Sequence, residues 1–460
     1  MGLEVKDKQI IGYVDEIGIE ELVIPEGIIG IKEGVFASCN LKKIVLPKSL
    51  EYIEDFAFCE CMDLEEVIIS ENLSIFGDGI FLGCDNLKSI NLQCSNFFIS
   101  IDGVIYSKDK KRLVLYPNYK MDTEYTVLDG TKVISPYAFC ESNVIKVNLP
   151  DSLECIGKSA FYRSQKLEIV NFNDNLDNIA RFAFGGCTKL DNIKLPSALK
   201  VINEYTFEDC ISLKNISLPE TLSKIDSYAF SSCTSLEKIT LNQNLELVND
   251  LAFSKCLSLK NIFSEGHYYK SIDGVLYRYR QNLLSLIFYP PGKEEKYYDI
   301  LDGTMSLGHY SVGSQNLLGV SIPNSVKKIN WYAFEDSPNL KYIKVLSFET
   351  FIKLNYECKI LALNYFVKNY NEFAEIDEFK EYIQEYKWEL ISYKDILIFM
   401  IYNIDNIFSY EEMLKVIDEV GTKDVELTAL LLNYINENFF VKKNNNEKMK
   451  RKRNGKNENR

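Results

Sequence analysis

The sequence repeats itself every 22 or 23 residues, and no other feature restricts the possible fold as strongly. Counting from Phe207, apolar residues follow at fixed steps, Pro219 lies twelve residues on, and Phe230 begins the next copy. The spacing of 23 holds across Phe161, Phe184, Phe207, Phe230 and Phe253, and the same frame reaches back to Ile24 and forward to Phe334. Self-similarity at this period is typical of a solenoid, in which each copy forms one turn and stacks on its neighbours.

One copy of the repeat predicts a short strand followed by a turn. Ile216 and Leu218 alternate with polar residues, so we expect a strand with both apolar side chains facing inward. The Leu-Pro segment that follows should close the coil, because proline cannot donate to a strand ladder. A single turn buries too few apolar side chains, at ~1.5–3 kcal/mol each, to offset the loss of chain entropy. The turns are therefore expected to be stable only as a stack.

Two longer intervals interrupt the period without breaking its frame. Phe81 to Phe139 spans 58 residues, and Phe253 to Phe334 spans 81 with Val312 in place of one Phe. Inserts of 35 and 36 residues account for both intervals, and both contain SIDGV, a Tyr-Pro pair and LDGT. Apolar alternation on either side of SKDKK or RYRQN predicts a β-hairpin in each insert, at about residues 98–130 and 267–303.

The frame L-x-x-I-x-L-P-x-x-L-x-x-I-x-x-x-A-F-x-x-C resembles the BspA-like leucine-rich repeat family, and so does the insert motif D-G-V-[IL]-Y…Y-P. The resemblance covers about residues 10–346. It implies an α/β repeat protein whose residues 1–346 form a right-handed leucine-rich-repeat solenoid, with a parallel β-sheet on the concave face and the two hairpins inserted. It also implies ligand binding, often adhesion at bacterial surfaces, and no catalysis.

Most of the twelve cysteines occupy one position of the repeat, three residues after the Phe. These are Cys39, Cys61, Cys84, Cys187, Cys210, Cys233 and Cys256, with Ser142, Ser164 and Ser337 at the same position in other copies. A small residue with a weak donor suits a buried turn, where it packs and bonds to backbone carbonyls. Serine at this position indicates that no disulfide is required. With two histidines and no recurring C-x-x-C, no zinc site is expected.

The repeat ends near Val345, and helical spacing then predicts an all-α domain at residues 347–441. Ser409 and Glu412 have the spacing of a capping box. The stretch KDVELTALLLNYI is similar to the second helix of ankyrin repeats, although the ankyrin signature T-P-L-H-x-A is missing. The domain is therefore either ankyrin-like or a small helical bundle that caps the solenoid.

The tail at residues 442–460 carries nine basic and two acidic residues and almost no apolar ones, which predicts disorder. It is either a solvated tail or a segment that contacts nucleic acid, anionic lipid or a targeting receptor. The whole chain has a formal charge of −14, which argues against specific nucleic-acid binding. It shows no signal peptide and no apolar run long enough to span a membrane, which alone favours the cytoplasm, whereas the family resemblance suggests the cell surface or secretion.

No catalytic site and no cofactor are expected, because the phosphate-binding, dinucleotide-binding, zinc-protease and serine-hydrolase motifs are all absent from the sequence. Three functions are weighed. The first is a binding scaffold for a protein or glycan, with adhesion as one form of it. The second is an intracellular adaptor that uses both the solenoid and the helical domain, and an enzyme is a distant third.

Strand alternation identifies the residues that would face a ligand. On the central strands, the positions on either side of the inward Ile carry amides, hydroxyls and ammonium groups: Asn171, Asn192, Lys194, Asn215, Ser217, Lys238 and Thr240. We expect this polar face to hydrogen-bond a protein or glycan, unless these residues are only solvent-compatible and their asparagines stack in ladders. The tyrosines of the two hairpins are a rival surface, if they are exposed.

Overall fold

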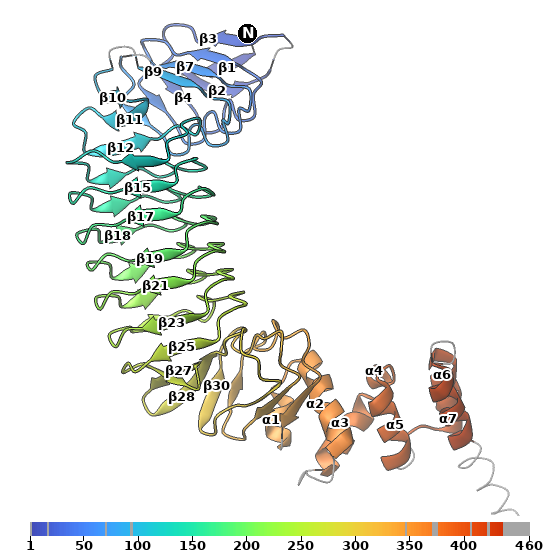
Figure 1. Ribbon diagram of the computed structural model, residues 1–460. Coiled ribbons are helices and arrows are strands. Elements are labelled where there is room, and N and C mark those ends of the chain that lie inside the picture. The colour runs from blue at the N-terminus through green and yellow to red at the C-terminus, as the bar shows by residue number, and fades with distance from the viewer. Residues whose placement is uncertain are drawn as a thin grey trace, which may run out of the picture. The chain divides into compact units, whose positions relative to one another are not determined.

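The computed structural model describes residues 2–15, 18–69, 71–92, 95–345, 347–369, 376–404, 407–420 and 424–435. It confirms a β-solenoid followed by a helical region (Figure 1). Internal contacts divide the chain into two compact units. Unit 1 comprises Met1–Glu295, Met305–Asn316 and Tyr332–Pro338, and unit 2 comprises Lys296–Thr304, Leu317–Trp331 and Asn339–Arg460. The domain boundaries drawn from the sequence at 346 and 441 stay predictions.

The first strand of each turn in unit 1 contains the inward residue of the repeat, most often Ile or Val, and most of these strands pair in parallel with a neighbouring turn. In β19 and β21, for example, Asn192 lies opposite Asn215 and Ile193 opposite Ile216. These first strands are β3 (Glu21–Val23), β5 (Lys43–Val45), β7 (Glu66–Ile69), β9 (Ser89–Leu92), β13 (Glu124–Thr126), β15 (Lys146–Asn148), β17 (Ile169–Asn171), β19 (Asn192–Lys194), β21 (Asn215–Ser217), β23 (Lys238–Leu241) and β25 (Asn261–Ser264).

Each regular turn also has a second strand of only two residues, where the sequence predicted a turn alone. These are β4 (Gly30–Ile31), β6 (Tyr52–Ile53), β8 (Ile75–Phe76), β14 (Val133–Ile134), β16 (Cys155–Ile156), β18 (Asn178–Ile179), β20 (Val201–Ile202), β22 (Lys224–Ile225) and β24 (Leu247–Val248). Two residues are too few for an alternating pattern to show. Parallel pairing with neighbouring turns, such as Ile202 with Ile225, is what makes them strands.

The repeated phenylalanines form a buried column through the turns. Phe184, Phe207 and Phe230 have no exposed surface, and the ring centroids of successive pairs lie 5.7 and 5.6 Å apart with nearly parallel planes. The repeated cysteine lies beside this column, as predicted. Cys210 Sγ donates to the carbonyl of Phe184 in the preceding turn at 3.3 Å, and Ser164 Oγ makes the same bond to Phe139 at 2.6 Å. No disulfide joins the cysteines that the structure describes.

Both inserts are antiparallel β-structures, as predicted, but each has three strands and ends earlier than the predicted range. They are β10 (Phe98–Ile101), β11 (Val104–Ser107) and β12 (Arg112–Leu115), then β26 (Tyr269–Ile272), β27 (Val275–Arg280) and β28 (Leu283–Phe288). A two-stranded hairpin, β1 (Leu3–Lys6) and β2 (Gln9–Tyr13), begins the chain. In the N-terminal hairpin and in the first insert, the last strand joins the ladder of two-residue strands, because β2 pairs in parallel with β4 and β12 pairs in parallel with β14.

A tyrosine replaces the phenylalanine of the buried column in these hairpin-bearing turns. The ring of Tyr13 lies 4.9 Å from Phe36, and the ring of Tyr116 lies 4.7 Å from Phe139. The loop before this tyrosine is two residues shorter than in a regular turn. Leu113 pairs with Ile134 across the ladder, yet Tyr116 follows Leu113 by three residues whereas Phe139 follows Ile134 by five. A hairpin-bearing turn therefore has a shortened outer loop.

In unit 2, a parallel ladder of β29 (Tyr297–Asp299), β31 (Gly319–Ile322) and β33 (Tyr342–Val345) precedes the helices. The remaining strands are β30 (Thr304–Leu307), part of which belongs to unit 1, and β32 (Lys328–Ile329). The helices are α1 (Phe348–Ile352), α2 (Tyr356–Asn369), α3 (Ile376–Glu385), α4 (Lys387–Leu390), α5 (Lys394–Asn403), α6 (Tyr410–Val420) and α7 (Val425–Ile435).

The helical region confirms the predicted capping box at the start of α6. Ser409 N donates to Glu412 Oε2 at 2.8 Å, and Glu412 N donates to Ser409 Oγ at 3.2 Å. The ankyrin-like assignment of this region stays a prediction, and the basic segment 442–460 lies outside the described residues. None of the helices in the described ranges has both the length and the apolar content needed to cross a bilayer.

Candidate functional site

The seven polar residues singled out from the sequence all have exposed side chains in the structure. They are Asn171 on β17, Asn192 and Lys194 on β19, Asn215 and Ser217 on β21, and Lys238 and Thr240 on β23. We call these seven residues the polar strand face. The Ile between each outward pair points inward, with Ile193 and Ile239 buried, because successive side chains of a strand point to opposite sides.

The centre of the polar strand face is the two-stranded sheet β19-β21. There Asn192 lies opposite Asn215 and Lys194 opposite Ser217. Asn171 belongs to the preceding sheet, β13-β15-β17, and the Lys238–Thr240 pair belongs to the following sheet, β23-β25. The structure thus places the seven residues on four consecutive first strands, although backbone pairing joins only four of them within one sheet.

Asparagine ladders occur on this face, as the sequence alternative anticipated. Asn215 Nδ2 donates to Asn192 Oδ1 at 3.0 Å, and Asn171 Nδ2 donates to Asn148 Oδ1 at 2.8 Å. Each of these bonds uses one amide donor and one acceptor, while a primary amide has two donors and two acceptor lone pairs. The ladder fixes the amide orientations and still leaves hydrogen-bonding capacity directed at solvent.

Charge is distributed unevenly along the first-strand ladder. Toward the N-terminus, Lys43 pairs with Glu21 at 3.2 Å, and Lys146 pairs with Glu124 at 2.8 Å. Hydrogen bonds from Lys146 and Asn148 lower the pKa of Glu124. On the polar strand face, by contrast, neither Lys194 nor Lys238 forms an ion pair with any described residue. The two ammonium groups there are available to a ligand.

The four tyrosines of the shared insert motif do not form an exposed surface, although Tyr268 and Tyr297 in the second predicted insert are exposed. Tyr106, Tyr116, Tyr277 and Tyr289 are all buried. The first hairpin explains why, because it is covered on both sides. Ile105 and Val114 pack into the core of the preceding turns, whereas Tyr106 and Leu113 pack into the core of the following turns. Alternation in a strand cannot distinguish such a two-sided layer from a hairpin with one exposed face.

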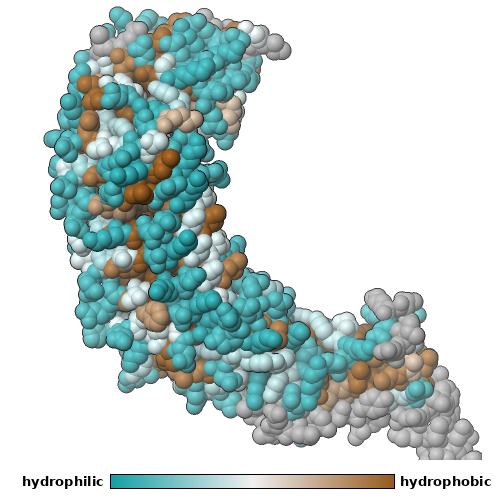
Figure 2. Space-filling view, in the orientation of Figure 1, coloured by the Kyte–Doolittle hydropathy of each residue, from teal (hydrophilic) through white to brown (hydrophobic). Residues whose placement is uncertain are grey.

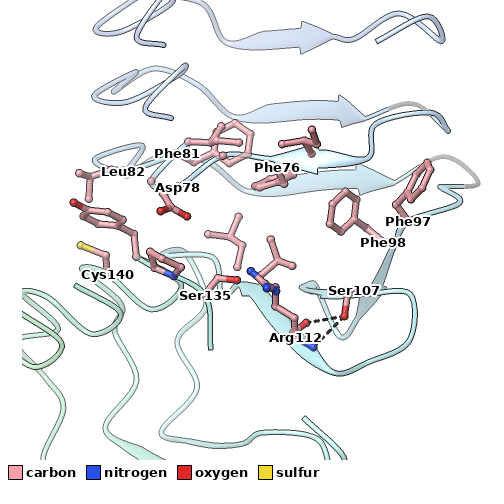
Figure 3. Close-up of a pocket in the computed structure, with 18 of the residues that line it drawn as sticks. Phe76, Asp78, Phe81, Leu82, Phe97, Phe98, Ser107, Arg112, Ser135 and Cys140 are labelled. Atoms are coloured by element: carbon pink, nitrogen blue, oxygen red, sulfur yellow. Dashed lines mark hydrogen bonds between the residues drawn. The ribbon is translucent and has the colours of Figure 1, made fainter. Parts of the chain in front are cut away.

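Two cavities of about 360 Å³ each, one at each inserted hairpin, were not predicted from the sequence. Asp78 and Arg112 line the first, and Asp250 and Tyr310 line the second (Figure 3 shows the first). Burial and the nearby Asp55 raise the pKa of Asp78, against the opposing charges of Lys158 and Arg112. The shortened loop before Tyr116 is the signal in the sequence that could have revealed the first cavity.

No cluster of three or more His, Cys, Asp or Glu side chains suited to a metal ion occurs within the described ranges. The visible surface is mostly hydrophilic, with hydrophobic residues in separate small areas (Figure 2). What the polar strand face offers chemically is an array of hydrogen-bond donors and acceptors with two positive charges. Such an array is chemically suited to hydrogen-bonding a partner, and among its seven residues there is no paired nucleophile and base.

Comparisons with known proteins agree with this architecture. A family model described as the BspA type leucine rich repeat region matches six copies, over residues 13–110, 132–260 and 294–379. A search of curated proteins gave no match. A leucine-rich cell surface protein from Faecalibacterium prausnitzii is 22% identical, with 75% of this chain and 74% of that chain covered and a TM-score of 0.41.

Two further solved structures are similar to this chain. A leucine-rich repeat protein from Eubacterium ventriosum is 19% identical, with 74% of this chain and 91% of that chain covered and a TM-score of 0.47. The pneumococcal vaccine antigen PcpA is 24% identical, with 56% of this chain and 78% of that chain covered and a TM-score of 0.43. These similarities concern the fold.

Proposed function

The chain belongs to the BspA-type leucine-rich repeat family, and from this membership we propose that it is a non-catalytic binding scaffold whose polar strand face holds a protein or glycan partner. The observation that carries the proposal is that all seven predicted residues are exposed, on four consecutive first strands. Family membership supports an interaction scaffold in general, and the identity of the face is the finer part of the proposal.

The composition of the face favours a hydrogen-bonding partner over an apolar one. Asn192, Asn215 and Ser217 supply donors and acceptors, and Lys194 and Lys238 supply positive charge without a competing ion pair. Neighbouring strands lie ~4.8 Å apart, so four strands present a surface roughly 15 Å long before their flanks are counted. A surface of that size suits a folded protein or an oligosaccharide better than a metabolite. Adhesion is one form that such binding would take.

The proposal is tested by screening the purified full-length chain against immobilised extracellular-matrix proteins and a glycan array. Every binder is then measured again with Lys194→Glu and with Asn215→Arg. We expect each variant to weaken binding at least roughly tenfold, because each places a wrong charge or a bulky group at a central contact. Lys166→Glu, a charge reversal at an exposed lysine off the strand face, serves as the matched control and should leave binding unchanged.

The variants must keep the wild-type melting temperature for this comparison to hold. Binders that respond equally to Lys194→Glu and Lys166→Glu would contradict the assignment of the face.

An adaptor that also uses its helical region is the second candidate function. Leu414 on α6 and Leu432 on α7 are apolar yet 45% and 52% exposed. Exposed leucines on neighbouring helices suit a second protein partner. A binder that is lost with Leu414→Glu and retained with Lys194→Glu would favour the adaptor, and fractionation of the source cells would show whether the protein lies at the surface or inside.

A further inference from the structure

The shortened loops create a cavity at the same place beside each inserted hairpin. In the second insert, as in the first, the loop before the tyrosine is two residues shorter than in a regular turn. Leu286 accepts a hydrogen bond from Gly308 N as Leu113 does from Ser135 N, and Tyr289 follows Leu286 by three residues. Asp78 and Tyr137 come from the turns on either side of the shortened loop and border the first cavity, and Asp250 and Tyr310 border the second.

The first cavity combines an apolar lining with one carboxylate, from Asp78, and one guanidinium, from Arg112. Phe76 and Phe81 from the preceding turn and Phe98 from the hairpin supply aromatic rings, and Val114 of β12 adds an aliphatic surface (Figure 3). Phe81, Phe98 and Val114 are otherwise buried in the core. Its volume of about 360 Å³ lies within the ~300–1,000 Å³ typical of small-molecule pockets.

The Asp78 carboxylate and the Arg112 guanidinium reach the cavity from opposite sides. Asp78 extends from the turn before the hairpin, and Arg112 extends from β12 (Figure 3). The backbone of each residue is anchored, since Asp78 N donates to Asp55 Oδ1 at 2.8 Å and Arg112 N to Ser107 Oγ at 3.0 Å. The charged ends of the two side chains are not held in this way. Across the described residues, neither the Asp78 carboxylate nor the Arg112 guanidinium has a hydrogen bond or an ion pair.

The placement of the two charges suits a bridging molecule. Asp78 and Arg112 line the same cavity, yet they form no direct ion pair. A group that carries both an ammonium and a carboxylate would satisfy both at once. Charge-assisted hydrogen bonds of this kind are among the strongest in proteins, and a guanidinium binds a carboxylate through two parallel bonds.

The second cavity provides an internal comparison. Asp250 occupies the position of Asp78, but its Oδ2 already accepts a hydrogen bond from His309 N at 3.2 Å. The lining includes Lys255 and a second carboxylate, Asp336, in place of an arginine on the hairpin. The pattern of one unengaged acid facing one unengaged arginine across aromatic rings belongs to the first cavity.

We propose that the first cavity binds a free α-amino acid with an aromatic or branched aliphatic side chain. The ammonium group pairs with Asp78, the carboxylate pairs with Arg112, and the apolar side chain lies among Phe76, Phe81 and Phe98. This small-molecule site is separate from the polar strand face and does not depend on the macromolecular binding proposed for it.

Calorimetric titration of the full-length chain with L-phenylalanine and two analogues tests the requirement for both charges. Phenethylamine lacks the carboxylate, and 3-phenylpropionate lacks the ammonium group. We expect one molecule of phenylalanine to bind per chain, roughly tenfold or more tighter than either analogue, since each analogue leaves one charged partner unpaired. Absence of phenylalanine binding at 10 mM, taken as about a hundred times a Kd of ~0.1 mM, or equal binding of phenylalanine and phenethylamine would overturn the proposal.

Two variants then assign the site. Asp78→Asn should weaken phenylalanine roughly tenfold without weakening 3-phenylpropionate, and Arg112→Gln should weaken phenylalanine roughly tenfold without weakening phenethylamine. Asp250→Asn, at the equivalent position of the second cavity, is the matched control and should leave phenylalanine binding unchanged. Circular dichroism checks that all three variants fold. Phenylalanine binding that survives both Asp78→Asn and Arg112→Gln would show that the ligand lies elsewhere.

Discussion

Equal positions of successive turns in unit 1 carry identical side chains, phenylalanine in a long inner column and asparagine in a short outer column of two residues, Asn192 and Asn215. The phenylalanine rings stack with centroids 5.0 Å apart between Phe161 and Phe184, and the amides of Asn192 and Asn215 join at 3.0 Å. Both columns arise because equal positions of successive turns lie side by side. Repetition in the sequence therefore does not separate a residue that holds the fold from one that contacts a partner, whereas burial does.

The sharpest test of this difference is Phe207→Ala. Phe207 is fully buried between Phe184 and Phe230, so the change leaves a cavity at the centre of the column. We expect the free energy of unfolding to fall by ~3–5 kcal/mol, measured by urea unfolding followed by circular dichroism. A loss as small as that of an exposed residue would mean that the column does not carry the stability of the turns.

An intermediate effect is expected for Cys210→Ser, which changes the residue that links the phenylalanine column to the preceding turn. The serine hydroxyl should replace the bond from Cys210 Sγ to the Phe184 carbonyl, as Ser164 does with Phe139. We expect a loss of about 1 kcal/mol, because the new hydrogen bond offsets the burial of a more polar group.

The same urea experiment measures that loss. Thiol titration of the denatured wild-type chain provides a second check and should give the same count with and without reductant. A count that rises markedly on reduction would show that disulfides stabilise the turns.

The smallest effect is expected for Asn215→Ala, on the outer column. Asn215 is exposed and loses one hydrogen bond to Asn192, so the free energy of unfolding should change by less than ~0.5 kcal/mol. A loss comparable to that of Phe207→Ala would show that the asparagine ladder is structural, and would remove the main argument for a binding face.

The solenoid could be predicted because its repeat is set by local chemistry that recurs in every turn. The inward Ile, the Leu-Pro turn and the buried Phe and Cys each follow from alternation, proline geometry or burial, and the outward positions such as Lys194 and Thr240 follow from the same alternation. All seven of those outward residues proved to be exposed. Their role in binding stays a prediction.

What the sequence did not reveal depends on contacts between turns. The two-residue strands such as Val201–Ile202 exist only through pairing with their neighbours. Tyr13 and Tyr116 take the place of phenylalanine in the buried column, each 23 residues before the next Phe, but the repeat frame was read from phenylalanine alone. The cavity lined by Asp78 and Arg112 lies beside a loop that is two residues shorter than in a regular turn, a signal in the loop length that hydropathy patterns do not register.

The first inserted hairpin also bears on how the repeat array transmits cooperativity. The buried core of unit 1 divides there into two clusters, with Ile105 and Val114 in one and Tyr106 and Leu113 in the other, and β8 and β12 belong to different sheets. In a linear array each turn is stabilised mainly by its nearest neighbours, so unfolding spreads through the interfaces between turns. An interface without a continuous ladder couples its neighbours weakly. Local unfolding that begins on one side of the hairpin is therefore expected to stop there and not to spread to the turns on the other side.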